Sequence, residues 1–220
     1  TDYEDILRTE VEVPLQFSAV TFRSDAGFSF IAYRGTDETI AGWKEDFMIS
    51  FTRTRAQTQA QAYANAYIDG ARRNYLIGHS KGGNEALFAA ANLRENKWGA
   101  VEHVFILDGP GLCPEVLDLG GMARVNEKAT HIVPEFSVVG KLFAADISDT
   151  RIVHSSASGF GQHSLITWGI DHGRLDLAEE NDATSLWLNA TVDGWIDGMD
   201  RQALSFTQAR MKAGDPPKWI

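Results

Sequence analysis

The residues Tyr75-Leu76-Ile77-Gly78-His79-Ser80-Lys81-Gly82-Gly83 are the most informative part of this chain, because they place a serine between two glycines at the end of a short apolar run. A strand that enters a sharp turn and leaves as a helix lifts the central side chain to the edge of a sheet. The flanking glycines are needed where a Cβ atom would clash with the neighbouring backbone. The pattern therefore predicts a nucleophile elbow with Ser80 at its tip.

The sequence on both sides of this motif predicts strands that alternate with helices. Strand-like runs cover residues 17–23, 28–34, 74–78, 101–107, 129–133 and 150–153, and the first two are joined by a hairpin turn at 24–27. Helical spacing covers residues 55–73 and 85–94, and a C-terminal helix carries an apolar stripe of Leu188, Val192, Trp195, Ile196 and Met199. Such alternation predicts a mostly parallel central sheet with helices on both faces. Together with the elbow, it indicates one α/β-hydrolase domain over residues 1–220.

The composition is that of a globular protein, with 44% hydrophobic and 23% charged residues among 220. A net charge of −10 and a pI near 5.0 argue against nucleic acid as a partner, because nucleic acid requires a basic surface. Cys113 is the only cysteine, so an internal disulfide cannot form. No run approaches the about 20 apolar residues of a membrane-spanning helix. We therefore expect a cytoplasmic protein without a transmembrane segment, although the missing initiator Met leaves a further N-terminal segment and secretion as alternatives.

A serine hydroxyl is a poor nucleophile at neutral pH, so Ser80 needs a histidine to accept its proton and an acid to orient that histidine. In this fold the acid precedes the histidine along the chain. Asp108 follows the first strand after the elbow helix, in a turn from which its side chain can reach the edge where Ser80 lies. The alternative for Asp108 is a turn-capping role. Glu135 and Asp146, in loops beyond the next strand, are the other candidate acids.

The candidate base is His163, which stands in the glycine-bearing loop 158–164 after a predicted strand. A mobile imidazole in such a loop can reach a serine at the sheet edge. His154 and His172 are alternatives, with a surface position as their simpler interpretation. Three other histidines are set aside. His79 lies on the other side of the backbone from the nucleophile, and His103 and His131 begin strands, opposite the catalytic edge. The spacing of the histidines matches no metal motif, so we expect neither a metal nor a cofactor.

The segment that follows residues 28–34 supplies candidate donors for an oxyanion hole. Gly35 allows a sharp turn at the end of the strand, so the N–H and hydroxyl of Thr36 can face a substrate carbonyl oxygen. The N–H of Lys81, directly after the nucleophile, would complete the hole. A strand-to-helix turn capped by Thr or Asp is the simpler interpretation of residues 35–37.

Three sequence features together resemble the class 3, fungal-type triacylglycerol lipases and their uncharacterised bacterial relatives. They are the stretch Tyr33-Arg34-Gly35-Thr36, the nearby Trp43 and Asp46, and the elbow at 78–83. The resemblance covers roughly residues 28–168. It implies an oxyanion role for Thr36, a short lid over residues 39–43 that includes Ile40 and Trp43, and a structural role for Asp46.

The chain departs from the class 3 pattern in two places. Class 3 lipases usually carry the triad acid after a later strand, before a hydrophobic-Pro sequence, and the comparable stretch 134–140 here contains no Asp. Asp108 instead is placed as in pancreatic-type lipases, whose Leu-Asp-Pro turn is similar to residues 107–110. Lys81 stands where lipases usually have an apolar residue, and its stem can lie along an apolar wall with the amine in water.

These features predict a serine hydrolase that cleaves a small-molecule or lipid carboxylic ester through an acyl-enzyme on Ser80. Thioester hydrolysis and acyl transfer are alternatives, because the same triad serves any activated acyl group. A catalytically inactive binding module with a hydrolase-like fold is an alternative from a different class.

Overall fold

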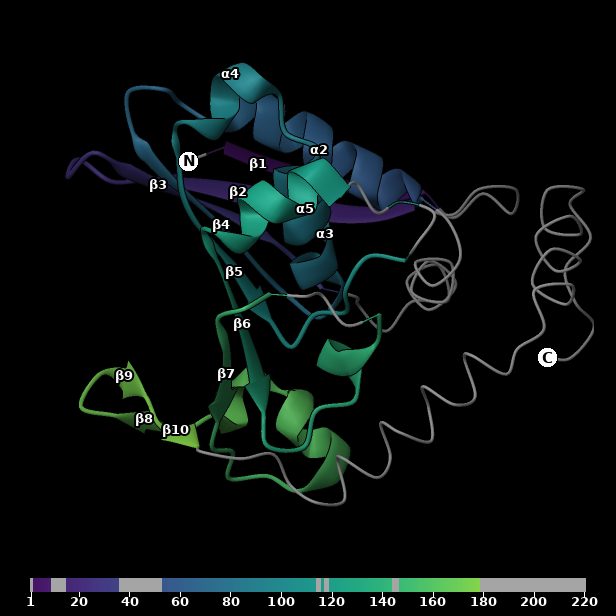
Figure 1. The fold of residues 1–220 in the computed structure, drawn as a ribbon, viewed down its shortest axis with the longest axis vertical. Helices are drawn as coiled ribbons and strands as arrows, with labels where there is room; N and C mark the ends of the chain where they lie inside the picture. The colour runs from purple at the N-terminus through teal and green to yellow at the C-terminus, as the bar shows by residue number, and fades with distance from the viewer. Residues whose placement is uncertain are drawn as a thin grey trace, which may run out of the picture.

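The computed structural model of the chain describes residues 2–8, 15–35, 53–113, 116, 119–143 and 147–178. Its centre is an eight-stranded sheet in the order β1-β2-β3-β4-β5-β6-β7-β10 (Figure 1). The strands are β1 (Asp2–Arg8), β2 (Leu15–Arg23), β3 (Phe28–Tyr33), β4 (Arg73–His79), β5 (Val101–Leu107), β6 (Ala129–Pro134), β7 (Thr150–Val153) and β10 (Leu177–Ala178). The five strands β3 to β7 pair in parallel, whereas β1, β2 and β10 pair antiparallel to their neighbours. The predicted mostly parallel sheet is confirmed.

The predicted hairpin at the start of the sheet is also confirmed. Strands β2 and β3 pair antiparallel, with Ala19 opposite Tyr33 and Arg23 opposite Ser29. Gly27 turns the chain with a φ of 83°, a conformation that residues with a side chain rarely adopt. Strand β1 was missed by the pattern analysis, because its sequence, Asp-Tyr-Glu-Asp-Ile-Leu-Arg, does not alternate strictly and looks like a charged terminus rather than an edge strand.

The helices that the structure describes are α2 (Arg55–Tyr67), α3 (Lys81–Ala91), α4 (Glu95–Trp98) and α5 (Leu119–Asn126). A capping box starts α2, since the Thr54 side chain accepts from the Gln57 N–H and the Gln57 side chain accepts from the Thr54 N–H. The helix ends at Tyr67, before the predicted end at 73, because Ile68 already has an extended backbone and a turn over residues 69–72 precedes β4. Helix α3 begins at Lys81, four residues before its predicted start.

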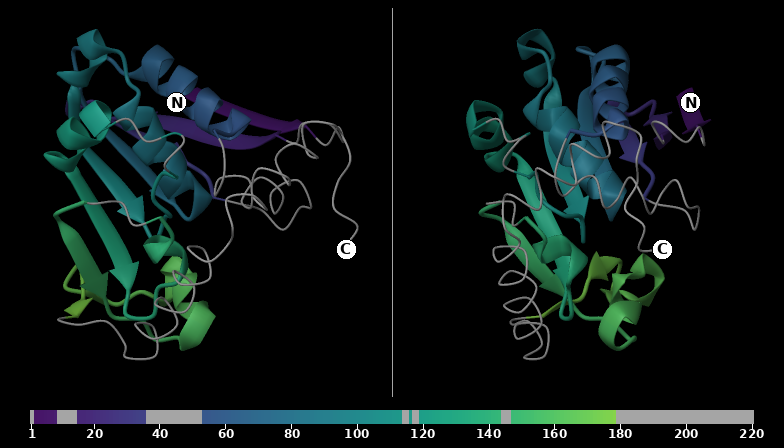
Figure 2. Two further views of the ribbon diagram at one scale, coloured as in Figure 1. Left: turned by 45° about the vertical axis from the view of Figure 1, so that its right-hand side comes forward. Right: turned by 90° about the vertical axis from the view of Figure 1, so that its right-hand side faces the viewer.

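The core lies between the sheet and the helices α2, α3 and α5, which pack against one another on one side (Figure 2). Every residue of α3 is buried, and its alanines allow close contact with β4, β5 and the flanking helices. The buried face of α2 consists of Ala56, Gln57, Ala60, Tyr63 and Ala64 at helical spacing. Because α3 follows β4 without a loop, this packing fixes the residue between them. The predicted C-terminal helix lies outside the described residues.

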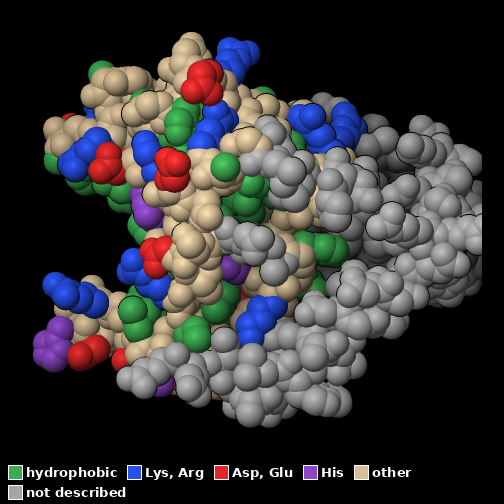
Figure 3. Space-filling model, in the orientation of Figure 1, with side chains coloured by type: hydrophobic (Ala, Val, Ile, Leu, Met, Phe, Trp, Pro, Cys, Tyr) green, Lys and Arg blue, Asp and Glu red, His purple; other side chains and the backbone are tan. Residues whose placement is uncertain are grey.

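The carboxyl ends of the parallel strands point towards a group of short helical turns (Figure 2). These turns are η1 (Val139–Lys141), η2 (Gly159–His163) and η3 (Leu165–Thr167), followed by the small hairpin of β8 (Ile170–Asp171) and β9 (Arg174–Leu175). On the face shown in Figure 3, basic and acidic side chains are intermingled over the described elements. None of the described helices has the length and apolar character that crossing a membrane requires.

Candidate active site

The turn between β4 and α3 has the geometry of a nucleophile elbow. Ser80 has a φ of 56° and a ψ of −129°, and its N–H donates to the Leu107 carbonyl of the adjacent strand. A Cβ added at Gly78 would lie 1.9 Å from the Gly82 carbonyl oxygen, and one at Gly82 would lie 2.3 Å from that of Tyr33. Only glycine fits at either position, as the sequence predicted. With this elbow at the edge of its parallel sheet, the chain has an α/β-hydrolase fold.

A hydrogen bond between an imidazole and a carboxylate links the ends of two distant segments beside this turn. Asp108 directly follows β5, and its Oδ2 lies 2.6 Å from Nδ1 of His163, the last residue of η2. A carboxylate can only accept, so it holds a proton on Nδ1 of the neutral imidazole and leaves Nε2 as an acceptor. That tautomer is the one required to take a proton from a hydroxyl. Among the described residues, the hydroxyl of Ser80 makes no hydrogen bond to His163.

Two further donors fix the Asp108 carboxylate, which is fully buried. The Ser137 hydroxyl donates to Oδ1 over 2.5 Å, and the Gly140 N–H donates to the same oxygen over 3.1 Å. A Cβ at Gly140 would lie 2.5 Å from Oδ1, so glycine is required for this approach. Both donors belong to the stretch 134–140, where class 3 lipases were expected to carry the acid. This stretch thus supplies hydrogen-bond donors to Asp108 in place of an acid, a role that the sequence analysis did not predict.

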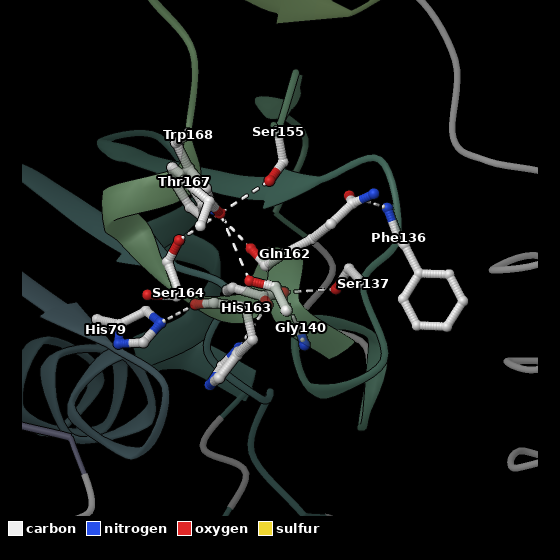
Figure 4. Close-up of polar contacts among 12 residues, drawn as sticks. His79, Phe136, Ser137, Gly140, Ser155, Gln162, His163, Ser164, Thr167 and Trp168 are labelled. Carbon is white, nitrogen blue, oxygen red and sulfur yellow. Dashed lines mark hydrogen bonds and ion pairs between the residues drawn. The ribbon is translucent and has the colours of Figure 1, made fainter. Parts of the chain in front are cut away.

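A set of polar contacts holds the segment that bears His163 (Figure 4). Gln162 is buried, and its side-chain oxygen accepts from the Phe136 N–H over 2.8 Å. Its backbone carbonyl accepts from the Trp168 indole N–H, also over 2.8 Å. The Thr167 hydroxyl lies 2.8 Å from that of Ser155. These contacts tie η2 to the residues after β6 and to the region that follows β7, which limits the freedom of the His163 backbone.

His79 is part of this cluster although the sequence analysis set it aside. Its Nε2 donates to the backbone carbonyl of His163 over 2.8 Å, and the two imidazole centroids are 4.5 Å apart with their planes tilted by 37° (Figure 4). Burial lowers the pKa of His79, and the nearby His163 ring lowers it further. The His79 ring is therefore neutral at pH 7.

The alternative histidines and acids are held elsewhere. His154 pairs with Glu135 over 3.1 Å, and His172 lies in an exposed turn, 2.7 Å from Asp171. Glu135 thus contacts His154 and not His163. Asp146 lies outside the described residues.

His131 was expected at the far end of the sheet, and the structure corrects this. Strand β6 is staggered against β5, so that His131 pairs with Ile106 near the carboxyl end of that strand. Its side chain is buried, with Nε2 lacking a hydrogen-bond partner. Burial is the main cause that lowers the pKa of His131, and the nearby Asp108 raises it. His103 is half-buried in the middle of β5, with Nε2 2.8 Å from the Thr130 hydroxyl.

The end of β3 passes directly against the elbow. A Cβ added at Gly35 would lie 2.8 Å from the His79 carbonyl oxygen and 3.4 Å from the Ser80 Cβ. This close approach explains a glycine at position 35. Thr36, Ile40, Trp43 and Asp46, to which the sequence analysis assigned the oxyanion, lid and structural roles, lie outside the described residues.

The side chain of Lys81 differs from its expected position with the amine in water. Lys81 is 3% exposed, and its Nζ donates to the backbone carbonyl of Gln16 over 2.9 Å and to the Gln16 side-chain oxygen over 3.2 Å. The side chain extends from the start of α3 to Gln16 of β2 and not into solvent. The positive charge beside the nucleophile is thus directed at β2.

Ser80 stands at a helix N-terminus, where the first N–H groups have no partner within the helix. This arrangement, next to a histidine held by a buried carboxylate, can perform nucleophilic chemistry in which a proton moves through the imidazole. No group of three potential metal ligands gathers among the described residues.

Comparison with known proteins identifies the family. A family model described as Mbeg1-like matches residues 2–209. A fungal lipase, solved as an inhibitor complex in work on interfacial activation, aligns over 70% of this chain and 65% of its own, with a TM-score of 0.43 and 16% identity. No curated protein matches the chain. The family match spans most of the sequence, and the chain therefore belongs to the Mbeg1-like family, a lipase-like family.

Proposed function

We propose that this protein is a serine hydrolase that cleaves a carboxylic ester through an acyl-enzyme on Ser80. The observation that carries the proposal is the 2.6 Å contact between Asp108 and His163, formed beside an elbow that holds Ser80 with a positive φ. A buried carboxylate after β5, an imidazole at the end of η2 and an elbow serine after β4 are the parts of a catalytic triad. Membership of a lipase-like family supports an ester as the substrate.

In the proposed reaction, Nε2 of His163 accepts the proton of the Ser80 hydroxyl as the oxygen attacks the ester carbonyl. Asp108 stabilises the imidazolium that forms. The imidazolium then gives the proton to the departing alcohol, and the acyl group stays on Ser80. His163 next removes a proton from water, which attacks the acyl-enzyme, and the proton returns to Ser80 as the acid leaves. Each half of the reaction ends with the imidazole neutral.

Negative charge on the carbonyl oxygen would be stabilised by the backbone N–H of Lys81 and by the N–H and hydroxyl of Thr36. Support for Lys81 is its place as the first residue of α3, and support for Thr36 is the packing of Gly35 against the Ser80 Cβ. One such donor typically lowers the barrier by about 3 kcal/mol. Ile40 and Trp43 are the proposed lid residues, and this assignment rests on the resemblance to class 3 lipases.

A fluorophosphonate probe tests the proposal, because it phosphonylates only an activated serine. We expect one label on the wild-type chain, mapped by mass spectrometry to Ser80, and none on Ser80→Ala. Folded wild-type protein that remains unlabelled would exclude a working triad and favour a binding module. Turnover of an oxygen ester and a thioester with the same acyl chain then separates ester hydrolysis from thioester hydrolysis.

A further inference from the structure

We propose that His79 is a positioning residue, which fastens the segment that bears His163 to the nucleophile elbow and so sets the place of the base relative to Ser80. The inference rests on the proposed function. Its geometric basis is the hydrogen bond from His79 Nε2 to the His163 carbonyl and the tilted contact of the two rings. His79 directly precedes Ser80 in the chain, so the residue that contacts the base, His163, is also the neighbour of the nucleophile.

Among the described residues, the other side-chain hydrogen bonds that hold η2 go to partners outside the elbow. Gln162 bonds to Phe136 after β6, its carbonyl bonds to Trp168, and His163 Nδ1 bonds to Asp108 at the end of β5. In the part of the chain that the structure describes, the hydrogen bond of the His79 side chain connects β4 to this segment. Without that bond, movement of η2 would change the separation of Ser80 and His163. Displacements of about 1 Å can reduce turnover about a hundredfold.

The chemistry of the pair suits this role. The His163 carbonyl can only accept, so the hydrogen bond requires a proton on Nε2 of His79. The neutral state of the His79 ring matters because a second positive charge beside His163 would oppose formation of the imidazolium. Burial keeps the pKa of His79 below its ordinary value and thereby preserves the neutral state. A hydrogen bond from a neutral donor fastens the segment without that electrostatic penalty.

Two substitutions separate the hydrogen bond from the ring contact. His79→Gln keeps an N–H donor at a reach comparable to Nε2 but removes the ring, whereas His79→Phe keeps an aromatic ring and removes the donor. His103 provides a matched control, since its Nε2 lies 2.8 Å from Thr130 and its ring centroid 4.6 Å from that of Phe105. His103→Gln and His103→Phe therefore make the same chemical changes in the middle of β5. His79→Leu, which lacks both ring and donor, serves if the phenylalanine variant does not fold.

The first measurement is the rate of fluorophosphonate labelling, divided into the maximal rate and the concentration for half-maximal rate. We expect His79→Phe and His79→Leu to lower the maximal rate about three- to tenfold, the range that corresponds to one neutral hydrogen bond. The half-maximal concentration should stay constant, because binding of the probe is untouched. His79→Gln should restore the rate to within about threefold of the wild type. Equal losses in all His79 variants, or no loss in any, would overturn the proposal.

The second measurement does not depend on activity. Hydrogen exchange of peptides that cover residues 158–168 should be about three- to tenfold faster in His79→Phe than in the wild type, with His79→Gln close to the wild type. The His103 variants should leave this segment unchanged. Unaltered exchange in His79→Phe would refute the anchoring role. If the wild type takes no label but the exchange result holds, the proposed function fails while the contact stands.

Discussion

Replacement of Asp108 by asparagine should abolish most of the activity for a reason that the local geometry dictates. Oδ1 of Asp108 accepts from both the Ser137 hydroxyl and the Gly140 N–H. These two donors require an oxygen at that position, so the asparagine must direct its NH₂ group towards Nδ1 of His163. An NH₂ group can only donate. The imidazole must then accept at Nδ1 and carry its proton on Nε2, which leaves it unable to take the proton of Ser80.

The expected loss is about 10⁴-fold in the rate of the chemical step, which corresponds to about 5.5 kcal/mol in the barrier. The loss of stability should be small, about 1 kcal/mol, since each of the three contacts of residue 108 keeps a donor and an acceptor. A burst of alcohol release from a chromogenic ester measures the acylation rate, and thermal unfolding measures the stability. The fold should therefore survive a change that nearly removes activity.

Glu135→Gln is the matched control, because Glu135 contacts His154 instead of His163. We expect its acylation rate to lie within about twofold of the wild type, in line with the small effects of exposed ion pairs. The reasoning would be refuted by an Asp108→Asn variant that keeps more than a tenth of the wild-type rate. It would equally be refuted if Glu135→Gln lost as much activity as Asp108→Asn.

Four further predictions concern the surroundings of the site. Ser137→Ala should reduce the stability by about 1.5–3 kcal/mol and slow acylation, because Asp108 loses a bond to a charged group; unchanged unfolding curves would contradict this. Gly82→Ala should cost about 3 kcal/mol or more, since its Cβ would lie 2.3 Å from the Tyr33 carbonyl oxygen, whereas Gly99→Ala, with open space, should be tolerated in the same melts. Lys81→Met should lose about 1–3 kcal/mol, because the Gln16 oxygens lose the hydrogen bonds of the ammonium, yet it should keep fluorophosphonate labelling, because the backbone N–H remains; lost labelling on folded protein would place the ammonium in the site. Burial lowers the pKa of His131 from 6.5, so the unfolded chain binds more protons than the folded chain. The free energy of unfolding should therefore fall as the pH drops below about 6.5. His131→Gln should reduce this change in the free energy of unfolding, measured by denaturant titrations at pH 5.5 and 7.5.

The fold could be predicted where a local pattern governs the backbone. The strands at 101–107 and 150–153 were predicted to the residue, because each run is rich in β-branched residues and has an Asp at one end, Asp108 or Asp149. Helix boundaries were less accurate. Helix α3 begins at Lys81 because of the elbow, although Gly82 and Gly83 have poor helix propensity and suggested a later start. Strand β1 forms because β2 offers an edge partner, which no pattern in residues 2–8 reveals.

The residues of the candidate site were easier to predict from the sequence than the contacts between them. Ser80 and His163 were identified by a motif and a loop, and the contact of His163 with Asp108 agrees with the preferred acid, whereas their catalytic roles remain predictions. Ser137 and His79 carried no motif of their own. Their contacts depend on the way β4, β6 and η2 meet at one edge, which involves separations of up to 84 residues along the chain.

The elbow follows from local sequence, because two glycines and a serine after a strand permit few backbone paths. Short-range periodicity likewise predicts the strands from β2 to β7 and the helices α2 and α3 between them. Which carboxylate meets His163 depends on long-range packing, since Asp108 and Glu135 both follow strands and the choice depends on where η2 returns to the sheet. Tertiary packing likewise buried Lys81 and brought His79 against His163, because the environment of a side chain is set by elements distant in sequence. Around the serine between its glycines, local chemistry defined the turn and long-range packing supplied its neighbours.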